Sequence, residues 1–290
     1  MTARHLLTVL LLLLCCHARA EEAASSVTRE EFEAGLKYQH GEVALPNGIA
    51  TLRIPDNFRY LGPEDAQRIL EQAWGNPQGG GTLGMLFPAD VSPLDAEGWG
   101  VVITYDEDGH VSDQDADSID YDKLMKDMQE STAEANAERA TLGQDPLELV
   151  GWAARPYYDK AARKMHWAKE LRVPNAPEHT LNYNIRILGR HGVLVLNAVS
   201  GMSQLSAIQS RMQEVLAFTE FNPGYGYSDF DPSIDKTATY GLAALVAGGV
   251  AAKAGLFAKL FALIIAFKKV LVVVVIGLIA GLRKLFARKG

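Results

Sequence analysis

Residues 180–200 read TLNYNIRILGRHGVLVLNAVS, and this stretch is the strongest indication of the fold in the sequence. Two runs rich in apolar and β-branched residues, 180–188 and 193–200, flank the short sequence Gly189-Arg190-His191-Gly192. Strand-forming runs separated by a short glycine-containing turn are typical of an antiparallel β-hairpin. The stretch therefore predicts two neighbouring antiparallel strands joined by a tight turn.

More strands and helices are predicted on both sides of this hairpin. Further strands are expected at 42–45, 49–54, 82–87, 99–105, 147–154 and 163–173. Helices are expected from the Thr28 capping box to about residue 39, and at 62–74, 121–142 and 202–218. Hairpins with helices inserted between them indicate an α+β fold, an antiparallel sheet with packed helices. Small secreted domains of the PsbP/Mog1 type have a similar order of elements.

Charge is distributed very unevenly along the 290 residues. All 35 acidic residues lie within 21–236, beside 18 of the 28 basic ones, so this part carries about −17. Residues 237–290 have eight basic side chains and no acidic one. Because a strongly acidic domain is repelled by phosphate backbones, we expect no nucleic-acid partner. The charge either keeps an exported domain soluble or attracts cations and basic partners.

The first twenty residues match a cleavable secretory signal peptide. Arg4 precedes an apolar run at 6–14 that is too short to span a bilayer, and Ala18-Arg19-Ala20 supplies small residues at the positions read by a signal peptidase. Cys15 and Cys16 are the two cysteines of the chain, so the mature protein would contain no thiol. The alternative is lipid attachment at one of these cysteines, although Leu14 is larger than the residue usually found before a modified cysteine.

The C-terminal segment contains three largely apolar blocks, 240–252, 254–267 and 270–282. Each block spans about 20 Å as a helix, less than the ~30 Å hydrocarbon layer. Joining part of the second block to the third gives 260–282, which is long enough to cross the membrane with Lys268 and Lys269 inside it. A crossing at 241–267 and a helical hairpin of all three blocks are the alternatives. The crossing at 260–282 is favoured because the basic residues after it would then be cytoplasmic.

These observations divide the chain into five parts. They are a signal peptide at 1–20, an exported acidic α+β domain at 21–232, a linker and apolar helix at 233–259, a transmembrane anchor at 260–282 and a basic cytoplasmic tail at 283–290.

An acidic run suggests the one candidate metal site. Asp113, Asp115 and Asp117 have the spacing of the first three oxygen ligands of a calcium-binding loop. However, Ser118 replaces the required glycine and Leu124 replaces the bidentate glutamate. The sequence therefore predicts either a weak Ca²⁺ or Mg²⁺ site or a solvated loop that caps the next helix. We expect no other cofactor.

Catalytic motifs are not visible in the sequence. It has no HExxH pair, no G-x-S-x-G nucleophile elbow and no phosphate-binding glycine loop with its lysine. Five aromatic residues lie on or beside successive predicted strands, and they either pack in the core or line a groove for a peptide, glycan or lipid. They are Trp152, Tyr157, Tyr158, Trp167 and Tyr183.

Several strings resemble a bacterial family of membrane-anchored proteins of unknown function, domain-of-unknown-function family 2167. They include Gly151-Trp152-Ala153, Trp167-Ala168-Lys169-Glu170-Leu171, Leu181-Asn182-Tyr183-Asn184 and Tyr240-Gly241-Leu242. The resemblance covers most of residues 40–255. It implies an envelope protein held in the bacterial inner membrane with most of the chain outside the cytoplasm. It implies no activity, ligand or catalytic residue.

Together, these features favour a non-enzymatic module that binds or organises another envelope protein, or that self-associates. The alternative is an envelope hydrolase whose carboxylates come together only in the folded chain.

The sequence predicts that the mature protein begins at Glu21, since Ala20 ends the peptidase recognition site. N-terminal sequencing of the membrane-extracted protein should therefore read Glu-Glu-Ala-Ala. A lipid-bearing start at Cys15 or Cys16 would contradict this prediction and would support lipid attachment.

Overall fold

The computed structural model describes residues 28–76, 81–95, 97–141, 143, 145–174 and 176–248. The chain divides after Leu36 into two units. In the first unit, α2 (Arg29–Ala34) begins with the predicted capping box: the Thr28 hydroxyl accepts a hydrogen bond from the Glu31 N–H, and the Glu31 carboxylate accepts one from the Thr28 N–H. The predicted helix to residue 39 was too long, because residues 38 and 39 form a strand.

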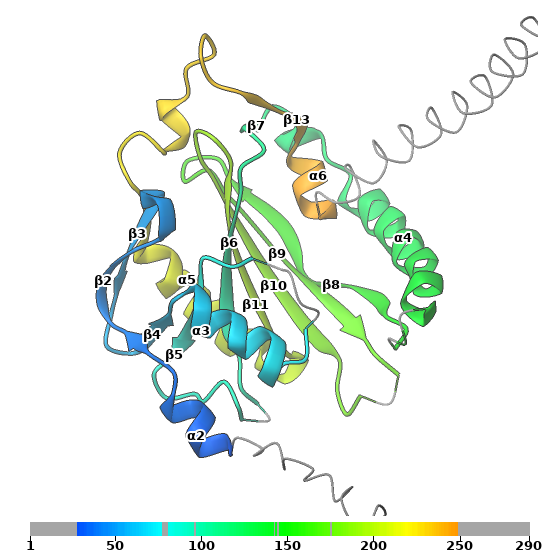
Figure 1. The fold of residues 1–290 in the computed structure, drawn as a ribbon. Helices are drawn as coiled ribbons and strands as arrows, with labels where there is room; N and C mark the ends of the chain where they lie inside the picture. The colour runs from blue at the N-terminus through cyan, green and yellow to red at the C-terminus, as the bar shows by residue number, and fades with distance from the viewer. Residues whose placement is uncertain are drawn as a thin grey trace, which may run out of the picture. The chain divides into compact units, whose positions relative to one another are not determined.

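The second unit is built on an eight-stranded sheet in the order β1-β4-β5-β6-β11-β10-β9-β8. Neighbouring strands are antiparallel throughout, which confirms the predicted α+β class with an antiparallel sheet (Figure 1). Its strands are β1 (Tyr38–Gln39), β4 (Phe58–Leu61), β5 (Gly84–Pro88), β6 (Gly100–Asp106), β8 (Glu148–Asp159), β9 (Lys164–Arg172), β10 (Thr180–Leu188) and β11 (Val193–Gly201).

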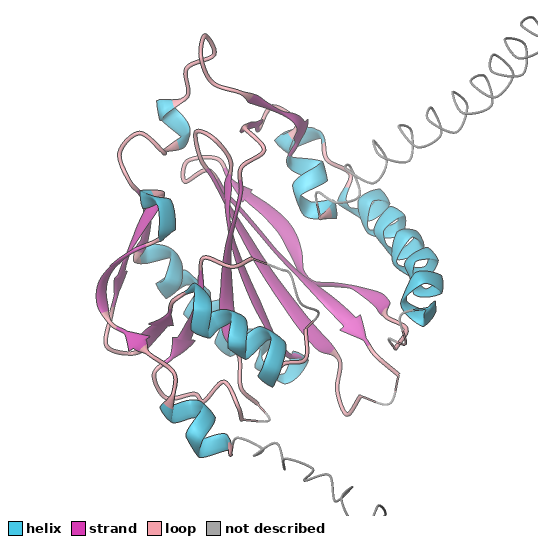
Figure 2. Cartoon of the chain, viewed as in Figure 1, coloured by secondary structure: helices cyan, strands magenta, loops and turns pink. Residues whose placement is uncertain are grey.

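Side chains along β10 separate the two faces of the sheet. Alternate residues beginning at Leu181 are buried in the main core together with α5 (Leu205–Ala217), which contributes Ile208, Met212 and Val215. The residues between them face the opposite side, because successive side chains of a strand point to opposite faces. On that side lie α4 (Tyr121–Thr141) and α6 (Leu242–Ala247), as Figure 2 shows.

A smaller sheet with the order β12-β3-β2 extends the core. Strands β2 (Gly41–Ala44) and β3 (Ala50–Ile54) form the predicted hairpin around Pro46-Asn47-Gly48. Asn47 and Gly48 have φ values of 63° and 65°, a conformation that asparagine and glycine accept more readily than other residues. Strand β12 (Thr219–Phe221) pairs with β3 and was not predicted.

The remaining helices agree closely with the predicted positions. α3 (Pro63–Arg68) continues into a π-helical turn, Ile69–Ala73, and ends at Trp74. α4 is 21 residues long and buries only two side chains, Met125 and Met128. Short 3₁₀ turns occur at Ala116–Ser118, Met202–Gln204 and Tyr227–Asp229.

The fold continues past residue 232, where the sequence placed the end of the domain. Strand β13 (Thr237–Gly241) pairs in parallel with β7 (His110–Ser112), and α6 follows it directly. Leu242, Leu245 and Val246 of α6 are buried. The first part of the predicted linker at 233–259 is therefore a strand and a helix of the packed domain, because its apolar residues complete the core.

The sequence-based predictions for the two ends of the chain concern residues outside those that the structure describes. These are the signal peptide at 1–20, the crossing at 260–282 and the basic tail. Within the described ranges, none of the helices combines the length and apolar character needed to cross a bilayer.

Asp115 holds the start of α6. Its Oδ1 accepts a hydrogen bond from the Leu242 N–H at 3.1 Å, and its Oδ2 accepts one from the Ala243 N–H at 3.2 Å. The residue at the N-cap position is Gly241, which has no side chain to do this. A carboxylate at a helix N-terminus satisfies free N–H groups and interacts favourably with the helix dipole. Asp115 therefore caps α6 from a position far away in the sequence.

The substitution Asp115→Ala should lower the free energy of unfolding by about 1 kcal/mol, the usual effect of losing a cap. Asp117→Ala is the matched control, since Asp117 is exposed and close in sequence, and it should change stability by less than about 0.5 kcal/mol. Chemical denaturation of the full chain measures both. Equal losses for the two variants would contradict the capping role.

Candidate functional site

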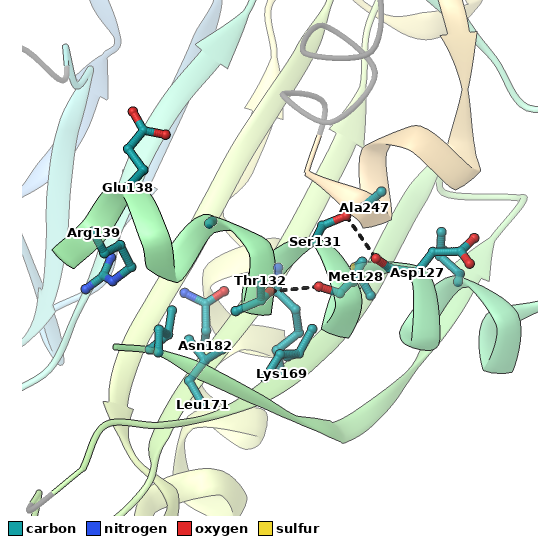
Figure 3. A pocket seen from close by; sticks show the side chains of 14 residues that line it. Asp127, Met128, Ser131, Thr132, Glu138, Arg139, Lys169, Leu171, Asn182 and Ala247 are labelled. Atoms are coloured by element: carbon teal, nitrogen blue, oxygen red, sulfur yellow. Dashed lines mark hydrogen bonds between the residues drawn. The ribbon is translucent and has the colours of Figure 1, made fainter. Parts of the chain in front are cut away.

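A cavity of about 650 Å³ lies between α4 and strands β8, β9 and β10 (Figure 3). Most of its walls are apolar, with side chains from α4, the strands and the end of α6: Leu124, Met128, Leu147, Leu149, Leu171 and Ala247. Lys169 of β9 and Asn182 of β10 project from the sheet into the space beneath α4. The cavity thus has apolar sides and two polar groups on its floor.

Polar contacts to one strand hold α4 over this cavity. Gln129 donates from Nε2 to the Leu149 and Val150 carbonyls at 3.2 and 3.0 Å. Asn136 exchanges two hydrogen bonds with the Leu147 backbone, at 2.9 and 2.8 Å. All these partners belong to β8 or to the residue just before it, at the edge of the sheet. Because α4 is attached along this edge, its inner face over β9 and β10 is not fully packed.

Lys169 stands directly opposite Asn182 in the pairing of β9 with β10. Burial lowers the pKa of the Lys169 ammonium, and the positive charge of Arg186 lowers it further. The Lys169 ammonium forms no hydrogen bond or ion pair with any residue that the structure describes. Lys169 is partly buried, so its ammonium has lost part of its hydration, and no anionic partner offsets that cost.

Neighbouring side chains fix the orientation of Asn182. Asn184 donates from Nδ2 to Asn182 Oδ1 at 2.6 Å. This contact leaves the Asn182 amide nitrogen as the group available to donate. On α4, Ser131 and Thr132 donate their hydroxyl hydrogens to carbonyls of their own helix, at 2.9 and 2.8 Å (Figure 3). The Lys169 ammonium and the Asn182 amide therefore offer donors to a ligand at the cavity floor, whereas the two hydroxyls on α4 have only acceptor lone pairs left.

Further polar groups continue along this face of the sheet. Arg186 lies 5.0 Å from the centre of the Trp167 ring, and burial lowers its pKa to about 10. Trp167 Nε1 and Asn197 Oδ1 are buried without a hydrogen-bond partner within the described part of the chain. Buried polar atoms are usually paired, so this face is unusually rich in unsatisfied groups.

The carboxylates on the cavity rim are separate from its floor. Asp127 forms an exposed ion pair with Lys123 at 2.5 Å. Glu138 is exposed near the other end of α4, beside Arg139, whose Nε donates to the Asp145 carbonyl at 2.8 Å. Neither carboxylate forms an ion pair with Lys169.

The three aspartates of the predicted cation site have different surroundings. Asp113 accepts hydrogen bonds from the Tyr158 and Tyr227 hydroxyls and forms an ion pair with Arg163. Burial alone would raise the pKa of Asp113, but these three partners lower it. Asp115 caps α6 and Asp117 is exposed. Among the described residues, no group of three His, Cys, Asp or Glu side chains is arranged to hold a metal ion.

The five aromatic residues of the predicted strands do not form one groove. Tyr183 and Trp167 are buried, Trp152 donates to the Tyr121 carbonyl at 3.3 Å, and Tyr158 contacts Asp113. Only Tyr157 of the five is strongly exposed, at 64%. It lines a smaller cavity beside α5 together with Trp167 and Tyr183, so three of the five share one concave surface. Core packing, the first of the two predicted alternatives, therefore describes most of the set.

The residues of the cavity floor, Lys169 and Asn182, were not singled out from the sequence as functional. A signal for Lys169 does exist, however. Met165 and Trp167 are buried on one face of β9, and Lys169 and the partly buried Leu171 continue the same alternation. A lysine on the apolar side of a strand is rare unless something is there to pair with it.

Comparison with curated proteins finds no match to this chain in sequence. Two solved structures are weakly similar in fold. The solution structure of cyanobacterial PsbP (CyanoP) from Synechocystis sp. PCC 6803 matches with 9% identity and a TM-score of 0.35, covering 64% of this chain and 94% of that one. The Saccharomyces cerevisiae Ran-binding protein Mog1p matches with 13% identity and a TM-score of 0.33, covering 68% and 100%. The sequence profile of one family matches residues 37–279, as the resemblance predicted, and the chain belongs to that family, described as "Protein of unknown function (DUF2167)".

Proposed function

We propose that this protein is a membrane-tethered binding module of the cell envelope, and that the cavity beneath α4 is its recognition site. The observation that carries the proposal is the combination of an apolar-walled cavity of about 650 Å³ with an unpaired lysine on its floor. Small-molecule sites are typically concave, mostly apolar and ~300–1,000 Å³ in volume, with a few polar groups that orient the ligand. The cavity has these properties.

The arrangement of carboxylates supports binding rather than hydrolysis. Asp127 and Glu138 are the acidic residues that line the cavity, and both are on α4. Eleven positions on a helix correspond to about 16 Å at ~1.5 Å per residue. Paired carboxylates in glycosidases stand only ~5–10 Å apart. Asp127 also interacts with Lys123 outside the cavity. The envelope hydrolase therefore remains the second candidate.

The proposed tether is the segment 260–282, with the acidic domain outside the cytoplasm and the basic tail inside. The positive charge after this segment and the signal peptide before the domain support this topology. Ala247 lines the cavity, and Leu260 is 13 positions after it in the sequence. Since an extended chain reaches at most ~3.3–3.6 Å per residue, the cavity would lie within about 45 Å of the membrane. An envelope component close to the membrane could then reach it.

A reporter that works only in the cytoplasm, fused after Gly290, should be active, because a single crossing places the tail inside. A reporter that works only outside the cytoplasm should be silent at the same position. The opposite result would support a helical hairpin and would overturn the single crossing.

Filling the cavity should remove any bound ligand. Ala135→Trp places a large ring in the cavity, whereas Ala137→Trp introduces the same ring about 200° away around α4. Both alanines are exposed, so both variants should fold. In native mass spectrometry of the full chain extracted from membranes, the wild type and Ala137→Trp should carry a bound species that Ala135→Trp lacks. The absence of any bound species, or equal amounts in all three proteins, would count against the proposed site.

A further inference from the structure

We infer that the cavity binds a single apolar chain that ends in a carboxylate, with the carboxylate held by Lys169 and Asn182. The inference rests on the proposed function and names the ligand class for the same cavity. It depends on the charge of the floor, on the kind of hydrogen-bonding groups there and on the apolar walls.

The charge of the floor calls for an anionic ligand. Lys169 is partly buried at the cavity floor, and the charge that most affects its pKa is that of another cation, Arg186. The two acidic residues of the cavity are exposed on the rim, and Asp127 interacts with Lys123. A partly buried cation without a counter-charge has lost some of its hydration, and a bound anion would offset that cost. The ligand group at Lys169 should therefore carry a negative charge.

The hydrogen-bonding groups of the floor favour a carboxylate. An ammonium offers three donors and no acceptor, and the oriented Asn182 amide adds further donors beside it. Directly opposite residues on antiparallel strands have Cβ atoms about 5 Å apart, so both groups can reach one ligand head. A carboxylate accepts several hydrogen bonds and carries one charge, which matches Lys169, because the other cation that lines the cavity, Arg139, donates from Nε to the Asp145 carbonyl. Phosphate recognition usually relies on bidentate arginine or on several cations together.

The walls favour an apolar chain behind this head group. Leu147, Leu149 and Leu171 lie on the strand side and Met128 on the helix side of the cavity. Such walls favour an apolar ligand, because the removal of apolar surface from water is favourable. One end of the ligand is therefore polar and the rest is apolar.

The chain's own C-terminal segment fits this site less well than an anionic ligand does. Ala247, the last residue of α6, lines the cavity, and many of the residues that follow it in the sequence are apolar. They are therefore an obvious candidate for the occupant of the cavity. However, residues 237–290 include no aspartate or glutamate and eight basic residues. No side chain of that segment could neutralise Lys169. A separate anionic ligand complements the charge of the floor, and this segment does not.

The test uses the full chain in phosphatidylcholine nanodiscs and three photoreactive probes with the same twelve-carbon chain. The probes end in a carboxylate, an alcohol or a quaternary ammonium group. After irradiation, peptide mapping measures the labelling of cavity residues such as Leu147 and Leu171. For each probe, labelling of the wild type is divided by labelling of Lys169→Met. This ratio cancels differences between the probes in partitioning into the bilayer.

The ratio should be at least tenfold for the carboxylate and close to one for the alcohol and the ammonium. Lys169→Arg retains the positive charge and should keep most of the carboxylate labelling. Lys126→Met removes an exposed lysine of α4 outside the cavity and should have no effect. Lys169→Met should fold, because it replaces a partly buried, unpaired charge with an apolar side chain of similar length, and its melting temperature verifies this.

The two proposals fail in different ways. Labelling of the cavity by all three probes, with a ratio near one for each, would overturn the carboxylate inference and leave the binding module intact. The absence of cavity labelling by every probe would overturn both.

Discussion

The alternation of side chains along β10 is the constraint on which both faces of the sheet depend. Tyr183 and Ile185 enter the core beside α5, while Asn182, Asn184 and Arg186 point the other way. A shift of one residue in the pairing would place the asparagines and the arginine in the core. The nine paired positions of the β10–β11 hairpin and the eight of β10 with β9 prevent such a shift. The cavity floor is thus a direct result of the register that forms the core.

The two faces are covered by different kinds of contact. The α5 side is closed by apolar packing, since α5 buries Ile208, Met212, Val215 and Leu216. On the other side α4 buries only two methionines and is held by Gln129 and Asn136 through backbone carbonyls and amides. Hydrogen bonds fix a distance and an orientation without filling the space between elements. A helix held in this way can leave a cavity where close packing would remove it.

The sequence predicts well what is determined by local contacts. The 180–200 hairpin, the Pro46-Asn47-Gly48 turn and the Thr28 capping box are all set by neighbouring residues, and the structure confirms them. The strands that were missed, such as β12 and β13, have three and five residues and pair with segments more than a hundred residues away. Asp115 shows the same limit: its spacing suggests a cation ligand, but its partners are N–H groups of α6. The alternation of side chains along β9 alone would have marked Lys169 as a lysine on an apolar face. Its missing partner becomes apparent only when all neighbouring strands and helices are in place.

The position of α6 also has a mechanical consequence. β13 pairs with β7, and Val246 of α6 packs against Met165 and Trp167 of β9. The polypeptide therefore leaves the described domain from a fixed point on the sheet and not from the end of a free linker. A force applied to the chain after α6 would therefore be transmitted through α6 and β13 to the sheet. Because Ala247 lines the cavity, the cavity lies beside the point where the chain leaves the described domain.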